Sequence, residues 1–243
     1  MKALDFESQQ RWQFFFAHPD DEAACSALLT RLTANHCPIS LNWAHSTEVR
    51  KEESMDAVAE LGLTLTDAHF AKFPDGDFVD HLVELRAWCR ERIEEFHPDR
   101  VVCASFEQGH LDHDSLNCAV SKNFDGPIIE FPEYWPYTRD WLRLRRFPNP
   151  AGQEILTLSP DELRQKVQVV KCFAMQTLPR NLALYSAVQA IRGEPNRLLA
   201  EEPYRIQGEI DYFSPQHEEP LRSRILRSER WKRWVSALKN SGL

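Results

Sequence analysis

Apolar and polar positions alternate in blocks along the first half of the chain, and these blocks predict strands and helices in turn. Short apolar runs, rich in aromatic and β-branched residues, predict buried strands at 12–16, 39–44, 67–73, 101–106 and 127–131. Helical patterns lie between the runs, at 21–34, 47–61, 78–96 and 115–122. This alternation is typical of an α/β fold, here a Rossmann-like, mainly parallel sheet with helices on both faces.

The pattern changes beyond residue 131. An irregular aromatic segment follows, which contains Tyr134, Trp135, Tyr137 and Trp141. Ser159 and Pro160 then predict the start of a helix that runs to about residue 176. Residues 220–239 predict one amphipathic helix with a basic face. We expect its apolar stripe to pack on the body of the protein, in preference to binding at a membrane surface.

We therefore expect a single domain over residues 1–243, with a Rossmann-like core at 1–135 and a C-terminal helical and irregular extension at 136–243. The aromatic segment could form a stacking wall for a sugar ring, but packing of later helices on the sheet is favoured for most of its rings. The nearby Arg143, Arg145 and Arg146 could bind a phosphate, although a solvated basic face is the more common arrangement.

The first candidate site follows the strand at 12–16. His18, Asp20, Asp21 and Glu22 come where this strand would pass into a helix, with Pro19 suited to the first helical turn. Ligands of α/β sheets bind at the carboxyl ends of strands. The alternative is that the acids only cap the helix. Their position beside a histidine and a second cluster favours a site.

The second cluster follows the strand at 101–106. His110 and His113 are three residues apart, so one helical turn could direct both toward the same point. Catalytic zinc commonly takes three ligands from histidine and carboxylate groups, and His18, Asp21 and His113 satisfy that count. Asp20 and His110 then remain for acid–base chemistry.

Together, AHPDDE at 17–22 and GHLDHD at 109–114 resemble the PIG-L/LmbE-like family of metal-dependent N-deacetylases. The resemblance continues through residues 47–62 and 73–76. It covers roughly residues 1–135. It implies Zn²⁺, or another divalent metal such as Fe²⁺, held by His18, Asp21 and His113. It also implies catalytic roles for three further residues, namely Asp20 as general base, His110 as oxyanion stabiliser or acid, and Asp112 as the group that orients His110.

Three substrate-binding positions also follow from the resemblance. Arg50 and Asp75 match positions that contact substrate hydroxyls. Gln108 stands where some members carry a tyrosine, and its amide could donate a hydrogen bond to an oxyanion. Two of these positions have an alternative, since Arg50 fits a solvated helix face with paired charges and Asp75 with the following glycine fits a simple turn.

Composition narrows the class of protein. A net charge of −8 argues against a nucleic-acid partner, which would require a basic face. No stretch is long and apolar enough for a membrane span, and residues 1–10 do not resemble a signal peptide, so we expect a cytoplasmic protein. The six cysteines are scattered and should be reduced thiols. Oligomerisation into a homo-oligomer is left open.

The resemblance implies a zinc-dependent N-deacetylase, a hydrolase acting on a linear amide C–N bond. It also implies that the substrate is a 2-acetamido sugar, such as N-acetylglucosamine, or its glycoconjugate, with acetate and a free amine as products. One alternative is a related amidase that cleaves another acyl or thiol-conjugate amide. Another is a non-catalytic sugar-binding protein that retains the fold.

Overall fold

The sheet at the centre of the protein has seven strands in the order β3-β2-β1-β4-β5-β9-β8. The computed structural model describes residues 2–6, 9–63, 67–138, 143–173, 180, 182–184, 186–187 and 198–242. The first five strands in this order are parallel, and β9 and β8 continue the sheet antiparallel. The prediction of a mainly parallel α/β sheet is confirmed.

The strands lie close to their predicted positions in the first half of the chain. They are β1 at Trp12–Phe16, β2 at Ile39–Trp43, β3 at Ala68–Phe70, β4 at Arg100–Ala104 and β5 at Ile128–Phe131. Further strands follow: β6 (Tyr134–Trp135) and β7 (Arg143–Leu144) form a separate two-stranded sheet, and β8 (Glu154–Thr157) and β9 (Glu201–Ile206) join the central sheet. The sequence analysis missed β8 and β9, so the sheet is not completed within residues 1–135.

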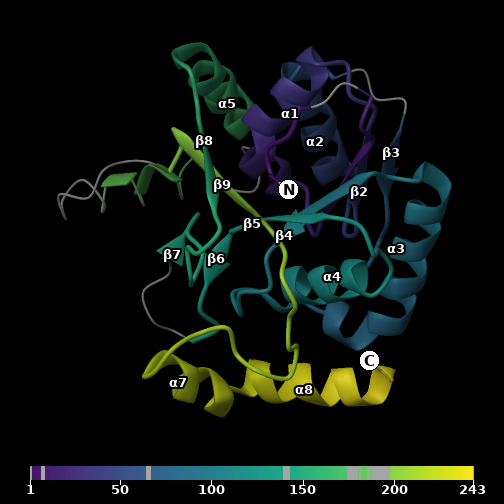
Figure 1. Ribbon diagram of the computed structural model, residues 1–243, viewed down its shortest axis with the longest axis vertical. Helices are drawn as coiled ribbons and strands as arrows, with labels where there is room; N and C mark the ends of the chain where they lie inside the picture. Colours follow the sequence, from purple (N-terminus) through teal and green to yellow (C-terminus); the bar gives the residue numbers. More distant parts are fainter. Residues whose placement is uncertain are drawn as a thin grey trace.

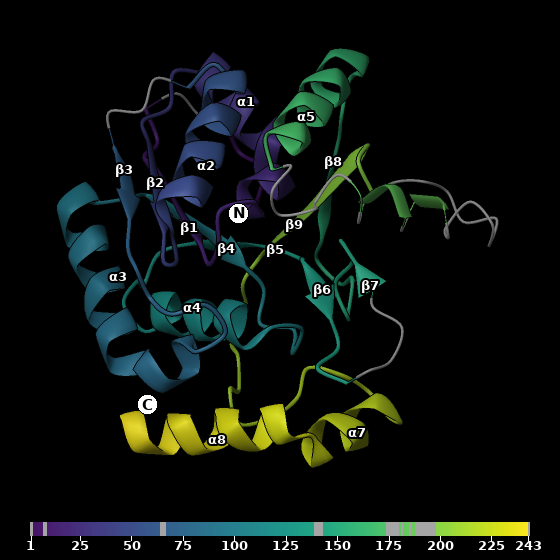
Figure 2. The ribbon, with the colours of Figure 1, turned by 180° about the vertical axis from the view of Figure 1, so that it is seen from behind.

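Helices cover both faces of the sheet (Figures 1 and 2). On one face α1 and α2 pack with α5, and on the other α3 packs with α4. Their bounds are η1 Asp21–Cys25, α1 Ser26–Ala34, α2 Glu48–Glu60, η2 Phe78–His81, α3 Leu82–Phe96, α4 Leu111–Ser121 and α5 Pro160–Cys172. Below α3 and α4, α7 (Leu221–Arg227) and α8 (Glu229–Ser241) close the bottom of the molecule in Figure 1.

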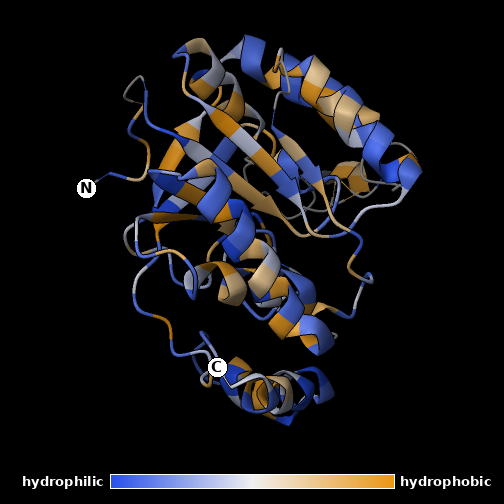
Figure 3. Cartoon of the chain, turned by 90° about the vertical axis from the view of Figure 1, so that its right-hand side faces the viewer, coloured by the Kyte–Doolittle hydropathy of each residue, from blue (hydrophilic) through white to orange (hydrophobic). Residues whose placement is uncertain are grey.

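Side chains from the strands alternate between two apolar cores, one on each face. Every residue of β1 is buried, with Phe14 and Phe16 in the core under α1, α2 and α5 and Phe15 in the core under α3 and α4. Figure 3 shows hydrophobic residues along much of the strands and hydrophilic ones over the outer helix surfaces. Burial on both faces explains the near-continuous apolar runs in the sequence.

Three predicted helix boundaries were wrong. The segment after β1 starts as a 3-10 turn at Asp21, so Pro19 precedes the helix and does not open it. α4 begins at Leu111, before the predicted start at 115. The C-terminal helix is divided at Ser228, whose extended backbone ends α7 and whose hydroxyl accepts a hydrogen bond from the Trp231 N–H to start α8.

Other expectations for the second half are confirmed. Ser159 and Pro160 open α5 with a complete capping box, although residues 174–176 lie outside the described ranges. The apolar stripe of the C-terminal helices is buried, through Ile225, Trp231, Trp234 and Leu238.

All six cysteines are described and free. Among the described residues, no helix has both the length and the apolar character needed to cross a membrane.

β9 contributes a buried carboxylate to the other half of the fold. The Glu202 side chain accepts hydrogen bonds from the N–H groups of Ala27 and Leu28 (3.0 and 3.2 Å) at the start of α1. It also pairs with Lys166 of α5 at 2.7 Å, and both side chains are buried. A carboxylate at a helix N-terminus satisfies unpaired N–H groups and the positive end of the dipole. Glu202 thus joins β9, α1 and α5.

Glu202→Ala should therefore lower the free energy of unfolding by about 3–5 kcal/mol, because it leaves the Lys166 ammonium buried without its partner. Urea denaturation measures the change. Lys72→Ala is the matched control, since Lys72 pairs with Glu48 on the surface with side chains 77% and 76% exposed. That control should change stability by no more than about 0.5 kcal/mol. Equal effects of the two substitutions would contradict a structural role for the buried pair.

Candidate metal centre and active site

The two sequence motifs meet where β1 and β4 end. β1 and β4 are neighbours in the sheet, but the chain leaves them toward opposite faces, to α1 and to α4. Open α/β sheets bind ligands at this kind of switch point. Residues 17–22 and 107–114 therefore lie side by side, as the sequence predicts.

The turn after β1 is held by two carboxylates. Asp21 accepts hydrogen bonds from the N–H groups of Ala17 and His18, at 2.8 and 3.0 Å, through the same oxygen. Asp20 has a positive φ of 116°, which is costly for a residue with a side chain. The buried Glu22 accepts the Asp20 N–H at 2.9 Å and the Trp43 indole N–H at 3.1 Å. Glu22 thus stabilises the turn that contains Asp20.

The start of α4 positions the second motif. His110 is the N-cap of α4, and its Nδ1 accepts a hydrogen bond from the Asp112 N–H at 3.2 Å. His113 lies in the first turn of this helix, where its side chain is buried. Asp114 accepts from the N–H groups of Glu107 and Gln108, at 3.0 and 3.3 Å, and so closes the loop between β4 and α4.

His18, Asp21 and His113 form a compact donor set. One nitrogen or oxygen atom from each lies within 4.8 Å of the others, and all three residues are buried. The Asp21 oxygen that faces His113 Nε2, at 3.5 Å, is not the one that accepts the backbone N–H groups. A His₂–carboxylate set with this spacing fits a zinc-type ion.

A second set shares His18, with His110 and Asp112 as its other members. The oxygens of Asp112 are already engaged: one accepts the Gly76 N–H at 2.7 Å and the other the Phe78 N–H at 3.1 Å. His18 Nε2 contacts the first of these oxygens at 3.0 Å. Asp112 therefore suits a supporting role better than that of a metal ligand. Its oxygen lies 3.9 Å from His110 Nδ1, so its closer partner is His18 rather than the predicted His110.

Charges in the cluster balance one another. Burial acts to lower the pKa of His18, but hydrogen bonds to Asp112 and Asp75 outweigh it and raise this pKa to about 10. Burial likewise opposes protonation of His113, whose pKa the Asp21 charge raises to about 9. Burial acts to raise the pKa of Asp21, but the charges of His113 and His18 outweigh it and hold this pKa below its usual range. A bound divalent cation would replace these protons.

His110 behaves differently from the other two histidines. Burial and the neighbouring His113 lower its pKa to about 4, so the ring is neutral near pH 7. Because its Nδ1 accepts the Asp112 N–H, the neutral ring carries its proton on Nε2. His110 can thus donate a hydrogen bond from Nε2.

Arg50 links two of the predicted site residues. Its guanidinium contacts an Asp20 oxygen at 3.6 Å and an Asp75 oxygen at 3.3 Å, and it donates to the Pro19 carbonyl at 3.1 Å. Its side chain is only 21% exposed. The alternative of a solvated helix face therefore does not describe Arg50.

Asp75 also approaches His18 Nε2 at 3.2 Å. Burial and the adjacent Asp21 charge raise the pKa of Asp20 above its usual range.

The side chain of Gln108 contacts the C-terminal part of the chain. Its side chain is fully buried, and its Oε1 accepts the Gln216 N–H at 2.8 Å from the segment before α7. This contact connects the β4–α4 loop to the C-terminal part of the chain. A substrate-binding role for Gln108 stays a prediction without a contact in its favour.

Two aromatic side chains lie beside the cluster: His45, which was not assigned from the sequence, and Tyr134, which was named only as part of the aromatic segment. His45 follows β2, and its ring lies 6.0 Å from that of His18. The Tyr134 ring lies 5.5 Å from His113 and 6.2 Å from His110. A Cβ at Gly109 would come within 1.4 Å of the Tyr134 carbonyl oxygen, so only glycine permits this approach. For His45 the available signal was a histidine directly after a strand.

The rest of the aromatic segment has mixed outcomes. Tyr137 is buried in the core beneath α8, as packing of the later helices predicts. Arg145 pairs with Glu133 at 3.5 Å and its side chain is 13% exposed, so the expectation of a solvated basic face was wrong for this residue. Trp141 lies outside the described residues.

Residues 13–124 match the family model "PIG-L: GlcNAc-PI de-N-acetylase". These residues are therefore similar to a PIG-L domain. The match includes both motifs and all the predicted site residues, and it confirms the resemblance found in the sequence. No curated protein gives a significant sequence match to the chain.

Solved structures share the fold of this protein. The zinc-inhibited form of teicoplanin deacetylase is 16% identical, with a TM-score of 0.58 over 83% of this chain and 100% of its own. The N,N'-diacetylchitobiose deacetylase of Pyrococcus horikoshii is 14% identical, with a TM-score of 0.57 over 84% and 87%. The 4-carboxy-2-hydroxymuconate hydratase of Pseudomonas putida KT2440 is also 14% identical, with a TM-score of 0.53 over 84% and 98%. At these identities the likeness establishes the fold, and the fold accommodates more than one reaction.

Glu107 should make the stability of the protein pH-dependent. Burial raises its pKa to about 8, although the side chain accepts hydrogen bonds from the Glu133 N–H and the Ser105 hydroxyl. The unfolded chain loses this proton near its ordinary pKa of about 4.5. Between about pH 5 and pH 8 the folded state therefore binds more protons, and stability falls as pH rises, by up to about 1.4 kcal/mol per pH unit.

In Glu107→Gln this slope should be smaller, because the amide keeps the shape and the acceptor but cannot titrate. Urea denaturation at pH 5, 6, 7 and 8 measures both proteins. Parallel curves for the two would show that Glu107 is ionised in the folded protein throughout this range.

Proposed function

We propose that this protein is a metal-dependent hydrolase that removes an N-acetyl group from a 2-acetamido sugar or its glycoconjugate. The observation that carries the proposal is the convergence of the His18, Asp21 and His113 donor atoms within 4.8 Å, in the segment that matches the PIG-L model. The deacetylases that share the fold support hydrolysis of an amide.

The donor set fits one divalent ion, which His18, Asp21 and His113 would hold. When bound, such an ion polarises an acyl oxygen and lowers the pKa of water. Two imidazole nitrogens and one carboxylate oxygen suit Zn²⁺, with Fe²⁺ as the alternative. Binding would release the protons that His18 and His113 carry in its absence.

Asp20 is the proposed general base. Its carboxylate lies beside the donor set, 25% exposed, and is held by the strained turn and by Arg50. It would take one proton from water as the water oxygen attacks the acetamide carbon. The raised pKa of Asp20 favours this transfer, because a stronger base accepts the proton more readily.

His110 is the proposed oxyanion donor. Its Nε2 proton can hydrogen-bond the acyl oxygen as negative charge develops there. The proton held by Asp20 then passes to the nitrogen as the C–N bond breaks, which yields an amine and acetic acid, and the acid releases its remaining proton to water as acetate. Asp112 would act by positioning, through its contacts to His18 and to the Gly76 and Phe78 N–H groups.

Sugar recognition is assigned to Arg50 and Asp75. Their side chains lie next to the cluster and offer donors and acceptors of the kind that bind ring hydroxyls. The fold neighbours named for teicoplanin and N,N'-diacetylchitobiose support a glycoconjugate substrate. Tyr134, beside His110 and His113, is the described ring best placed to contact an acyl group or sugar face.

The two adjacent aspartates should fail in different ways. Asp20→Asn should keep about one divalent ion per chain and lose activity about 10²-fold or more, because it removes the base alone. Asp21→Asn should lose the metal first. Elemental analysis of the purified variants, with acetate release as the second measurement, separates the two. Metal loss in Asp20→Asn with metal retention in Asp21→Asn would reverse the roles.

Substrate class is tested by acetate release from N-acetylglucosamine, its conjugates and N-acetylated amino acids. We expect turnover of the sugars and little of the amino acids, because a site built to bind hydroxyls leaves its own polar groups unpaired with substrates that lack them. Asp75→Ala should reduce this preference without reducing metal content. Equal turnover of amino-acid substrates would overturn the sugar assignment, and absence of acetate release from all amides would overturn the hydrolase.

A further inference from the structure

Residues 75–80, here called the Asp75 loop, form one wall of the site. Asp75 contacts His18 and Arg50, at 3.2 and 3.3 Å. Two N–H groups of the loop, from Gly76 and Phe78, donate to the buried Asp112 carboxylate at 2.7 and 3.1 Å. The inner side of the loop is therefore fixed by the candidate site itself.

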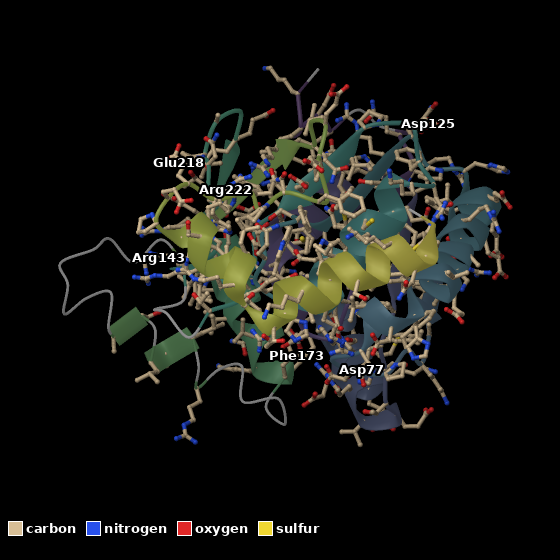
Figure 4. All side chains as sticks on the ribbon, turned by 90° about the horizontal axis from the view of Figure 1, so that it is seen from below. Asp77, Asp125, Arg143, Phe173, Glu218 and Arg222 are labelled. Atoms are coloured by element: carbon tan, nitrogen blue, oxygen red, sulfur yellow. The ribbon has the colours of Figure 1, made fainter. Side chains whose placement is uncertain are left out.

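The outer side of the same loop contacts α8. Arg233 Nη2 lies 2.6 Å from an Asp77 oxygen and 2.5 Å from an Asp80 oxygen. Its Nη1 donates to the Gly76 carbonyl at 3.4 Å. Figure 4, which views the molecule from below, shows α8 across the front with Asp77 beside it. One guanidinium thus joins the first and second halves of the loop.

α8 is itself held firmly against the body. Trp231, Trp234 and Leu238 are buried in a core that also contains Val79 of the loop. The Trp234 indole N–H donates to the Tyr212 carbonyl at 2.8 Å. A long charged side chain on a well-packed helix is a fixed point against which a loop can be ordered.

We propose that Arg233 is a positioning residue that holds the Asp75 loop in its substrate-binding arrangement, so that α8 controls substrate affinity from outside the segment matched by the PIG-L model. Among the contacts of the described residues, Arg233 reaches the donor set and the proposed substrate-binding residues only through the loop. The role in affinity rests on that proposed function, whereas the ordering of the loop does not.

The ion pairs that Arg233 makes are half-exposed, with side chains 38%, 54% and 56% exposed for Arg233, Asp77 and Asp80. Pairs of this kind contribute little to global stability. Their effect is local, because they restrict a loop that already has two hydrogen bonds to Asp112. Removal of Arg233 should therefore loosen the loop while the sheet and the helices remain folded.

The test compares Arg233→Ala with Lys232→Ala. Lys232 is the neighbouring residue, has the same charge and pairs only with Glu229 on its own helix among the described contacts. In Arg233→Ala we expect KM for the acetamido sugar to rise about 5-fold, with kcat and metal content near those of the parent protein. Arg233→Lys should recover part of the loss, since an ammonium can pair with Asp77 or Asp80 but not with both carboxylates and the Gly76 carbonyl together.

Hydrogen exchange measures the loop without reference to activity. The amide protons of Gly76 and Phe78 should exchange about 5-fold faster in Arg233→Ala than in Lys232→Ala or the parent protein. Unchanged exchange at these amides, or a loss of kcat and metal equal to the change in KM, would overturn the proposal. If the parent protein releases no acetate, the proposed function fails, and the exchange measurement still decides whether Arg233 orders the loop.

Discussion

The buried carboxylate of Asp112 joins the loops that follow three different strands. It accepts the Gly76 and Phe78 N–H groups from the loop after β3, contacts His18 after β1, and itself stands in the first turn of α4 after β4. A buried carboxylate is costly unless its oxygens are hydrogen-bonded. The Asp112 carboxylate is therefore fully hydrogen-bonded only when all these segments are folded, so we expect the parts of the site to form together.

The same requirement explains the electrostatic pattern around it. Burial alone would raise the pKa of Asp112, yet its contact with His18 holds that pKa below the usual value. Asp21 and His113 form a second pair of this kind, which also lies close to His18. Alternating imidazoles and carboxylates keep the metal-free cluster nearly neutral. They also place nitrogen and oxygen donors close enough to hold a cation.

Residues of the second half of the chain contact the segments that carry the site. Glu202 of β9 satisfies the N-terminus of α1, the helix that continues from the first motif. The N–H of Gln216, before α7, donates to the side chain of Gln108, directly before the second motif. Arg233 of α8 contacts the Asp75 loop. These contacts reach the helix after the first motif, the residue before the second motif and the Asp75 loop, so residues beyond 135 support the site as well as complete the sheet.

The amino-acid sequence determined the elements whose signals are local. Apolar runs buried on both faces marked β1 to β5, and the spacing within the two motifs indicated His18, Asp21 and His113, which the tertiary structure brings together. It did not reveal β9, because this strand contains Pro203 and acidic residues, and its Glu202 is buried against Lys166 and α1. Nor could it show that Asp112 faces His18, that Gln108 turns toward Gln216, or that Tyr134 lies beside His113. Those contacts join residues 94, 108 and 21 positions apart in the chain, and only folding decides which distant side chains share the same buried space.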